Sequence, residues 1–121
     1  MDPLKRAVTD DSMLVLLKAF ERLRMLDREM PGQVVSTFLY IASHDPCHKQ
    51  AIEEDLVHTT ASCSRNIDWL CDRSRYEQRA GLQLVEKYRD PSNGRRFLVR
   101  LTPKGQALAR DIHSDLYGPI R

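Results

Sequence analysis

The chain has 121 residues, of which 41% are hydrophobic and 30% are charged, a composition typical of one globular domain over residues 1–121. No run approaches the roughly 20 apolar residues of a membrane span, and no apolar stretch follows the charges at the amino terminus as in a secretory signal. We therefore expect a cytoplasmic protein without a membrane partner. Three cysteines are an odd number for a disulfide framework, which predicts reduced thiols.

The net charge of +2 is unevenly distributed along the chain. Residues 1–64 contain 7 Lys/Arg and 10 Asp/Glu, whereas residues 65–100 contain 9 and 5. A basic middle segment in a nearly neutral chain is typical of one cationic face, although a solvated surface can produce the same pattern.

The first predicted helix begins after possible caps at Asp10, Asp11 and Ser12 and runs to about residue 27. Its apolar residues recur at intervals of three and four: Met13, Leu16, Leu17, Phe20 and Leu23. Leu14 and Val15 widen this face beyond what one core contact needs. A partner chain could cover part of it, or the helix could be sunk in its own core.

Three further helices are predicted between residues 31 and 73. Pro31-Gly32 begins one that Asp45-Pro46 ends. A short helix over residues 49–56 follows, and Thr59 and Thr60 offer caps for another. The last of the three directs Cys63, Ile67 and Leu70 inward, and Cys63 is expected to be a packed thiol. Two short helices with so close a connection predict a helix-turn-helix over about residues 49–73.

Apolar residues that alternate or form short runs predict two strands over residues 82–89 and 95–101. The turn residues Asp90-Pro91-Ser92-Asn93-Gly94 separate them, and Asn-Gly is expected to supply the positive φ of a tight hairpin. The predicted hairpin covers about residues 82–101. Thr102 then caps a last helix with Pro103 at its first position.

This order predicts a mainly α fold with a small β-hairpin, a winged helix-turn-helix with flanking N- and C-terminal helices. In that fold the second helix of the pair enters the major groove of DNA and the hairpin, or wing, reaches the backbone or minor groove. Arg95 and Arg96 at the tip would meet the concentrated negative potential of a narrow minor groove. A turn that only increases solubility is the alternative.

Two stretches of the chain resemble MarR-type winged-helix regulators. Residues 90–105, DPSNGRRFLVRLTPKG, are similar to the family's wing and exit, D-P-x-[DN]-G-R followed by V-x-L-T-P-K-G. Residues 59–70, TTASCSRNIDWL, resemble its recognition helix. The resemblance implies a double-stranded DNA-binding transcription regulator, such as a repressor, that is a homodimer through its first and last helices.

Carried over by position, the resemblance implies a set of DNA-facing residues: Thr60, Ala61, Ser62, Ser64, Arg65, Asn66, and the wing arginines Arg95 and Arg96. Their chemistry fits, since Arg can grip the two acceptors of guanine, Asn can pair with adenine, and small hydroxyl residues let a helix approach phosphate. Ser62, Arg65 and Asn66 are expected to share one face. Glu53 and His58 depart from the small and apolar residues of the family, so the third helix is expected to pack differently.

The segment CDRSRYEQRAGL, residues 71–82, is roughly eight residues longer than the corresponding connection in the family. A longer recognition helix or an ordered excursion would both fit. Arg73, Arg75 and Arg79 would then be additional backbone contacts, or the segment would dock a protein partner.

No enzyme, cofactor or metal site is predicted. His44, Cys47 and His48 include zinc-ligand types, but they lack a second pair at a recognisable spacing. No thiol lies near the first helix, where a peroxide sensor of this family would need one. No nucleophile-base pair or phosphate-binding glycine loop stands out.

Three functions therefore compete: a transcription regulator that occupies operator DNA, a protein-interaction winged helix, and an architectural or replication-accessory DNA binder with little sequence preference. The operator, the regulated genes, the direction of regulation and any small effector are not encoded in these patterns.

Overall fold

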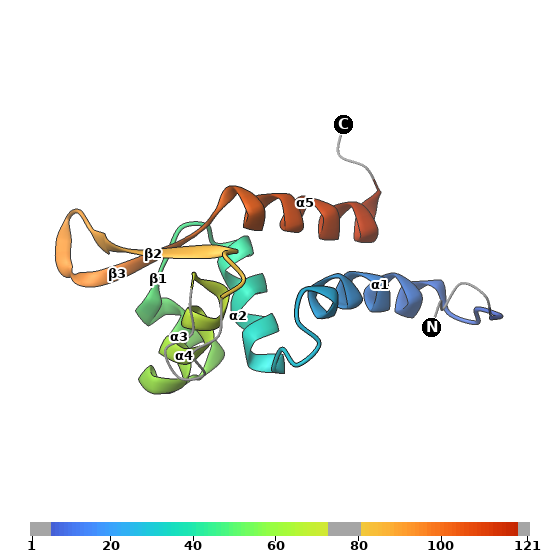
Figure 1. The fold of residues 1–121 in the computed structure, drawn as a ribbon, viewed down its shortest axis with the longest axis horizontal. Coiled ribbons are helices and arrows are strands. Elements are labelled where there is room, and N and C mark those ends of the chain that lie inside the picture. Colours follow the sequence, from blue (N-terminus) through green and yellow to red (C-terminus); the bar gives the residue numbers. More distant parts are fainter. Residues whose placement is uncertain (1–5, 73–80, 119–121) are drawn as a thin grey trace. The chain divides into compact units, whose positions relative to one another are not determined.

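The computed structural model describes residues 6–72 and 81–118 (Figure 1). They form two compact units, one of Met1–Met30 with Ala109–Arg121 and one of Pro31–Leu108. The single domain predicted over residues 1–121 stays a prediction. Within the described ranges, no helix is both long and apolar enough to cross a membrane.

The larger unit begins with three helices, α2 (Gly32–Ser43), α3 (Lys49–Leu56) and α4 (Thr60–Leu70). Val57 ends α3 in the left-handed conformation with φ of 55°. The Thr59 hydroxyl then accepts a hydrogen bond from the Ser62 backbone N–H at 3.1 Å, which caps α4. This short connection confirms the predicted helix-turn-helix.

A three-stranded antiparallel sheet completes the larger unit. Its strands are β1 (Cys47–His48), β2 (Val85–Asp90) and β3 (Asn93–Leu101), in the order β1-β3-β2. The two-residue β1 was not predicted, because alternation cannot be detected over so short a segment. The hairpin of β2 and β3 extends away from α3 and α4 (Figure 1). The five helices of the described residues, with this small sheet, confirm the predicted fold class.

The turn of the hairpin lies within the predicted residues 90–94 but does not use Asn93-Gly94. Pro91 and Ser92 form it, while Asn93 and Gly94 already belong to β3, and Gly94 does not have a positive φ. The expectation of an Asn-Gly turn is therefore wrong. The physical reason is Asp90, whose Oδ1 accepts hydrogen bonds from the Ser92 N–H at 2.9 Å and the Ser92 hydroxyl at 2.7 Å. This side-chain turn closes the hairpin without a left-handed residue.

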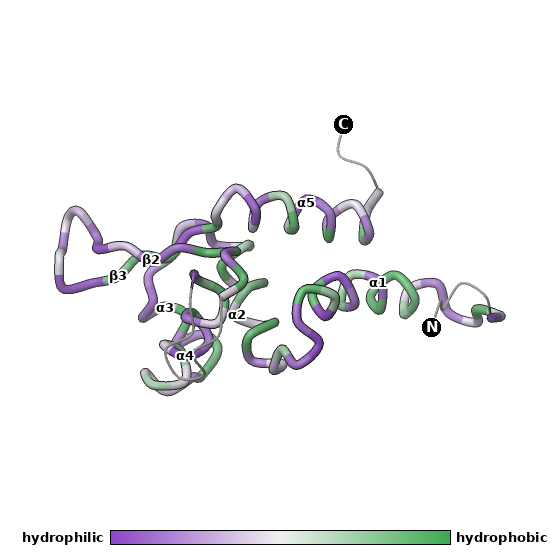
Figure 2. The backbone as a smooth tube through the Cα atoms, in the orientation of Figure 1, coloured by the Kyte–Doolittle hydropathy of each residue, from purple (hydrophilic) through white to green (hydrophobic). Residues whose placement is uncertain are grey.

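The core of the larger unit lies between α2, α3, α4 and the sheet. The apolar stripe of α2 is visible as green segments of the tube in Figure 2, whereas the wing tip is hydrophilic. The fully buried side chains of the helices include Phe38, Ile41, Ile52, Cys63, Ile67 and Leu70. Cys63 is thus packed inward, as predicted. These contacts fix the orientation of α4, the predicted recognition helix.

The smaller unit contains α1 (Asp11–Leu26) and the second half of α5 (Pro103–Tyr117). The Asp10 carboxylate accepts from the Ser12 and Met13 N–H groups and caps α1. Arg22 donates a hydrogen bond to Asp115 Oδ1 at 3.0 Å, which joins the two helices. At the start of α5, the Thr102 hydroxyl accepts from the Gly105 N–H at 3.0 Å, as expected of a cap.

The inserted segment leaves and rejoins the fold at one place. α4 ends at Leu70 and the backbone of Cys71 is extended, so α4 does not continue into the insertion. The Gly81 N–H donates to the Asp72 carbonyl at 2.7 Å, and the Leu84 N–H donates to the Leu70 carbonyl at 2.8 Å. These hydrogen bonds hold the residues just before β2 beside the end of α4. The predicted contacts Arg73, Arg75 and Arg79 lie outside the described residues.

Candidate nucleic-acid interface

The exposed side of α4 carries most of the predicted recognition residues. Thr60, Ala61 and Arg65 are exposed, and Ser62 and Ser64 are half-buried. Arg65 Nη2 lies 3.3 Å from the Ser62 hydroxyl, so these two residues share a face as expected. The helix therefore presents an arginine and small polar residues on one side.

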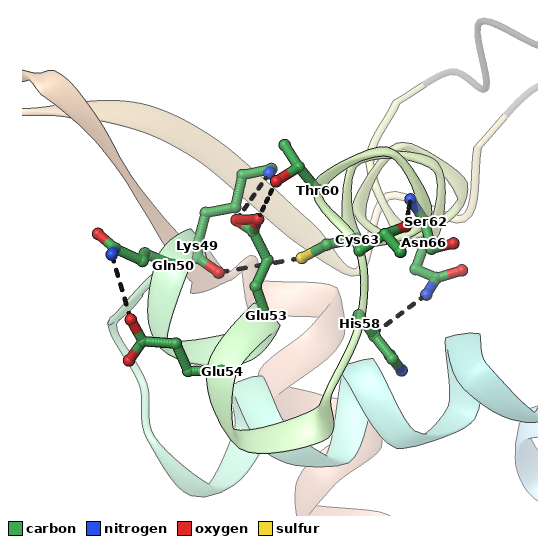
Figure 3. A network of polar contacts seen from close by, with 10 residues as sticks. Lys49, Gln50, Glu53, Glu54, His58, Thr60, Ser62, Cys63 and Asn66 are labelled. Atoms are coloured by element: carbon green, nitrogen blue, oxygen red, sulfur yellow. Dashed lines mark hydrogen bonds and ion pairs between the residues drawn. The ribbon is translucent and has the colours of Figure 1, made fainter.

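Asn66 does not lie on that exposed face. Its side chain is directed inward and only 7% of the residue is exposed. Asn66 Nδ2 donates to Gln33 Oε1 of α2 at 3.3 Å. The same nitrogen lies 3.5 Å from His58 Nδ1 (Figure 3). The expectation of a face shared by Ser62, Arg65 and Asn66 is thus wrong for Asn66, because a partner on α2 satisfies its amide. The Asn66 amide thus links α4 to α2.

The start of α4 is linked to α3 by one carboxylate. The Thr60 hydroxyl donates to Glu53 Oε1 at 2.6 Å, and the Lys49 ammonium donates to Glu53 Oε2 at 3.0 Å (Figure 3). The Thr60 hydrogen bond, and after it Lys49, lower the pKa of Glu53 against the raising effect of burial. The side chain is therefore ionised at neutral pH, and Glu53 joins α3 to the start of α4; that α3 packs differently from the family stays a prediction.

The wing presents its two arginines to solvent. Arg95 and Arg96 are exposed, and no hydrogen bond or ion pair of their side chains is recorded among the described residues. Residues around them brace the backbone: Asn93 Oδ1 accepts from the Arg95 N–H at 3.2 Å, and Arg89 Nη1 donates to the Gly94 carbonyl at 2.6 Å. The two guanidinium groups thus extend from a hairpin whose backbone is held by these two hydrogen bonds.

The turn of the wing is attached to the helix-turn-helix through a histidine. His48 Nε2 lies 2.9 Å from Asp90 Oδ2, although 42 residues separate them in sequence. The hydrogen bonds from His48 and Ser92 hold the pKa of Asp90 well below its usual range. Because β1 pairs with β3 at His48 and Leu98, this contact connects the start of α3 to the turn of the wing.

The wing and the start of α3 enclose an open hollow of about 180 Å³. Arg95, Arg96 and Phe97 line it from the wing, and Lys49 and Glu53 line it from α3. Sequence reasoning identified the arginines but missed the roles of Lys49, Glu53 and the His48–Asp90 pair. The departure of Glu53 from the family pattern was the available signal, since an acidic residue beside a predicted DNA contact needs a partner.

The thiols and imidazoles do not form a metal cluster in the described ranges. Burial raises the pKa of the Cys47, Cys63 and Cys71 thiols to about 11, so they are protonated at neutral pH. His44 stacks on the Tyr40 ring with centroids 4.2 Å apart, and His48 contacts Asp90. The two imidazoles are thus each in contact with a side chain of the fold.

A helix-turn-helix of α3 and α4, followed by the antiparallel hairpin of β2 and β3, defines a winged helix-turn-helix protein. Solved structures with this fold are MarR-family regulators. The fold therefore agrees with the resemblance carried by residues 59–70 and 90–105.

Three solved structures illustrate the likeness. The chain is 25% identical to an S. aureus MepR mutant bound to an oligodeoxyribonucleotide, with a TM-score of 0.62 over 85% of this chain and 68% of that chain. It is 16% identical to RV1404 from Mycobacterium tuberculosis, with a TM-score of 0.66 over 92% and 78%. It is 19% identical to an E. coli MarR mutant complexed with operator DNA, with a TM-score of 0.56 over 86% and 75%. No protein-family model and no curated protein matches the chain.

Proposed function

We propose that the protein is a double-stranded DNA-binding transcription regulator of MarR type. α4 would enter the major groove and the wing arginines Arg95 and Arg96 would reach the minor groove or its phosphates. The observation that carries the proposal is the pair of exposed arginines at the end of a supported hairpin that adjoins a helix-turn-helix. Three structural neighbours were solved with DNA, and the neighbours are regulators rather than enzymes.

The decisive experiment is selection of binding sites from random duplexes, followed by titration of the selected duplex at several salt concentrations. A regulator should enrich one sequence and lose affinity steeply with salt, because each neutralised phosphate contributes about 0.9 to the slope of log K against log salt. A sequence-tolerant architectural binder should show the slope without enrichment. A protein-interaction winged helix, with residues 71–82 as the docking surface, should show neither.

Arg65 is proposed to read a base. Arg65→Ala should relax the preference at one base pair in each half-site, with a loss of about 1 to 3 kcal/mol of discrimination. Arg65→Lys is the matched control, since it keeps the charge but loses the planar fork; it should preserve the salt slope and still lose the preference. Equal weakening on every sequence by Arg65→Ala would instead make this residue a phosphate contact.

A homodimer through the first and last helices is also proposed. The structure groups α1 with the end of α5 in one unit, and α1 retains a broad exposed apolar face. Its members are Met13 at 57% exposed, Leu16 at 54%, Leu17 at 41% and Phe20 at 42%. An apolar face of this size on a helix is typical of a surface that a partner covers.

Sedimentation at micromolar concentration should therefore give about twice the mass of one chain. Introducing Leu17→Glu and Phe20→Glu together should halve this mass, because two buried carboxylates would have no partners. Leu39→Glu is the control, since Leu39 is an equally exposed apolar residue of the other unit, at 44%. A wild-type monomer that binds one half-site would contradict the dimer.

A further inference from the structure

The Glu53 carboxylate is bonded to two donor groups that could otherwise bind an anion. Its carboxylate accepts from the Thr60 hydroxyl at 2.6 Å and from the Lys49 ammonium at 3.0 Å (Figure 3). The Lys49 and Glu53 side chains are only 13% and 18% exposed, so this ion pair is more shielded than an ordinary surface pair. Within the part of the chain that the structure describes, the Lys49 ammonium and the Thr60 hydroxyl both donate to Glu53, and the lysine charge is neutralised locally.

We propose that Glu53 attenuates DNA binding by holding the Lys49 ammonium and the Thr60 hydroxyl, which together form a latent site for one backbone phosphate. The inference rests on the DNA-binding function proposed for α4 and the wing. It assigns a regulatory side chain to that surface, distinct from the residues that contact DNA directly.

The position of the pair supports this assignment. Lys49 and Glu53 line the same open hollow of about 180 Å³ as Arg95 and Arg96. A phosphate that approaches the wing arginines therefore meets, on the opposite wall, an ammonium that is already neutralised and a carboxylate that repels it. Because Glu53 is ionised at neutral pH, this repulsion is present under ordinary conditions.

The neighbouring acidic residues of α3 do not share this arrangement. Glu54 accepts from the Gln50 amide at 3.1 Å, within α3, and Asp55 accepts from the Tyr40 hydroxyl at 2.6 Å. Glu54 is exposed and does not line the hollow. Glu54→Gln therefore removes the same charge one residue away and provides a matched control for Glu53→Gln.

The test compares these two variants with the wild type on one duplex, titrated between about 50 and 200 mM salt. Glu53→Gln should steepen the slope of log K against log salt by about 0.9, because Lys49 becomes free to neutralise one phosphate. Its affinity should rise about fivefold at the lowest salt. Glu54→Gln should leave the slope at the wild-type value, and adding Lys49→Met to Glu53→Gln should remove the gained slope.

Equal slopes for Glu53→Gln and Glu54→Gln would overturn the proposal, as would a gain that persists after Lys49→Met. A thermal melt checks the fold, and Glu53→Met, an apolar side chain of similar length, replaces the glutamine variant if that variant does not unfold cooperatively. A wild-type protein that binds no duplex would refute the proposed function itself. Steep salt-dependent binding by the wild type without a change in Glu53→Gln would refute only the attenuation.

Discussion

Replacing Arg95 and Arg96 together by alanine should weaken binding to every duplex by about 30- to 150-fold, since two charge-assisted hydrogen bonds contribute about 2 to 3 kcal/mol. Both guanidinium groups are exposed at the end of the β2–β3 hairpin, and no partner within the described chain holds them. The loss should be similar for all sequences if the wing contacts phosphates, because phosphate contacts carry no direct sequence information.

The salt dependence separates this effect from misfolding. Losing one or two phosphate contacts should flatten the slope of log K against log salt by about one to two units. Arg28→Ala with Arg110→Ala removes the same charge from exposed positions of the other unit and should leave the slope unchanged. An unchanged slope in a folded Arg95/Arg96 double variant would show that the wing does not neutralise DNA phosphates.

Gly105→Ala should destabilise the larger unit by about 3 kcal/mol, at the upper end of overpacking substitutions. A Cβ atom built on Gly105 would lie 2.0 Å from the Leu84 carbonyl oxygen, which is backbone and cannot rotate away. The same carbonyl accepts a hydrogen bond from the Thr102 N–H at 3.0 Å, and the Thr102 hydroxyl donates to the Gln83 carbonyl at 2.7 Å. The start of α5 is thus held closely against the entry to β2.

The midpoint of thermal unfolding should fall by roughly 9 to 15 °C in Gly105→Ala. Gly32→Ala is the control, because no heavy atom lies within 4 Å of its added Cβ and alanine favours the helix more than glycine. The control should keep or raise the midpoint. If Gly105→Ala melts within about 3 °C of the wild type, the contact between α5 and β2 is looser than the geometry indicates.

The elements that sequence reasoning predicted correctly are those governed by near neighbours. Cys63, Ile67 and Leu70 lie three and four residues apart, so a helix places them on one side, and all three are fully buried. Caps act over a similar range: the Thr59 and Thr102 hydroxyls each accept from an N–H three residues later. The alternating apolar residues of β3 likewise predicted the hairpin.

Predictions failed where a side chain found a partner that spacing does not reveal. Asn66 was expected on the exposed face because Ser62 lies four residues earlier, but the amide of Gln33, 33 residues away, holds it inward. The turn was predicted within Asp90–Gly94 with Asn-Gly tolerating its positive φ, yet the Asp90 carboxylate closes it at Pro91 and Ser92.

The sequence by itself determined the winged helix-turn-helix, the second helix of its pair and the arginine-bearing wing, because periodicity, capping and turn chemistry depend on residues within one or two turns of each other. Only the tertiary structure decided which polar side chains are available to a ligand. His48 meets Asp90 across 42 residues, and Glu53 holds Thr60 across the turn between α3 and α4. Such contacts depend on which elements pack side by side, and the hydrogen-bonding groups that they satisfy have partners inside the protein.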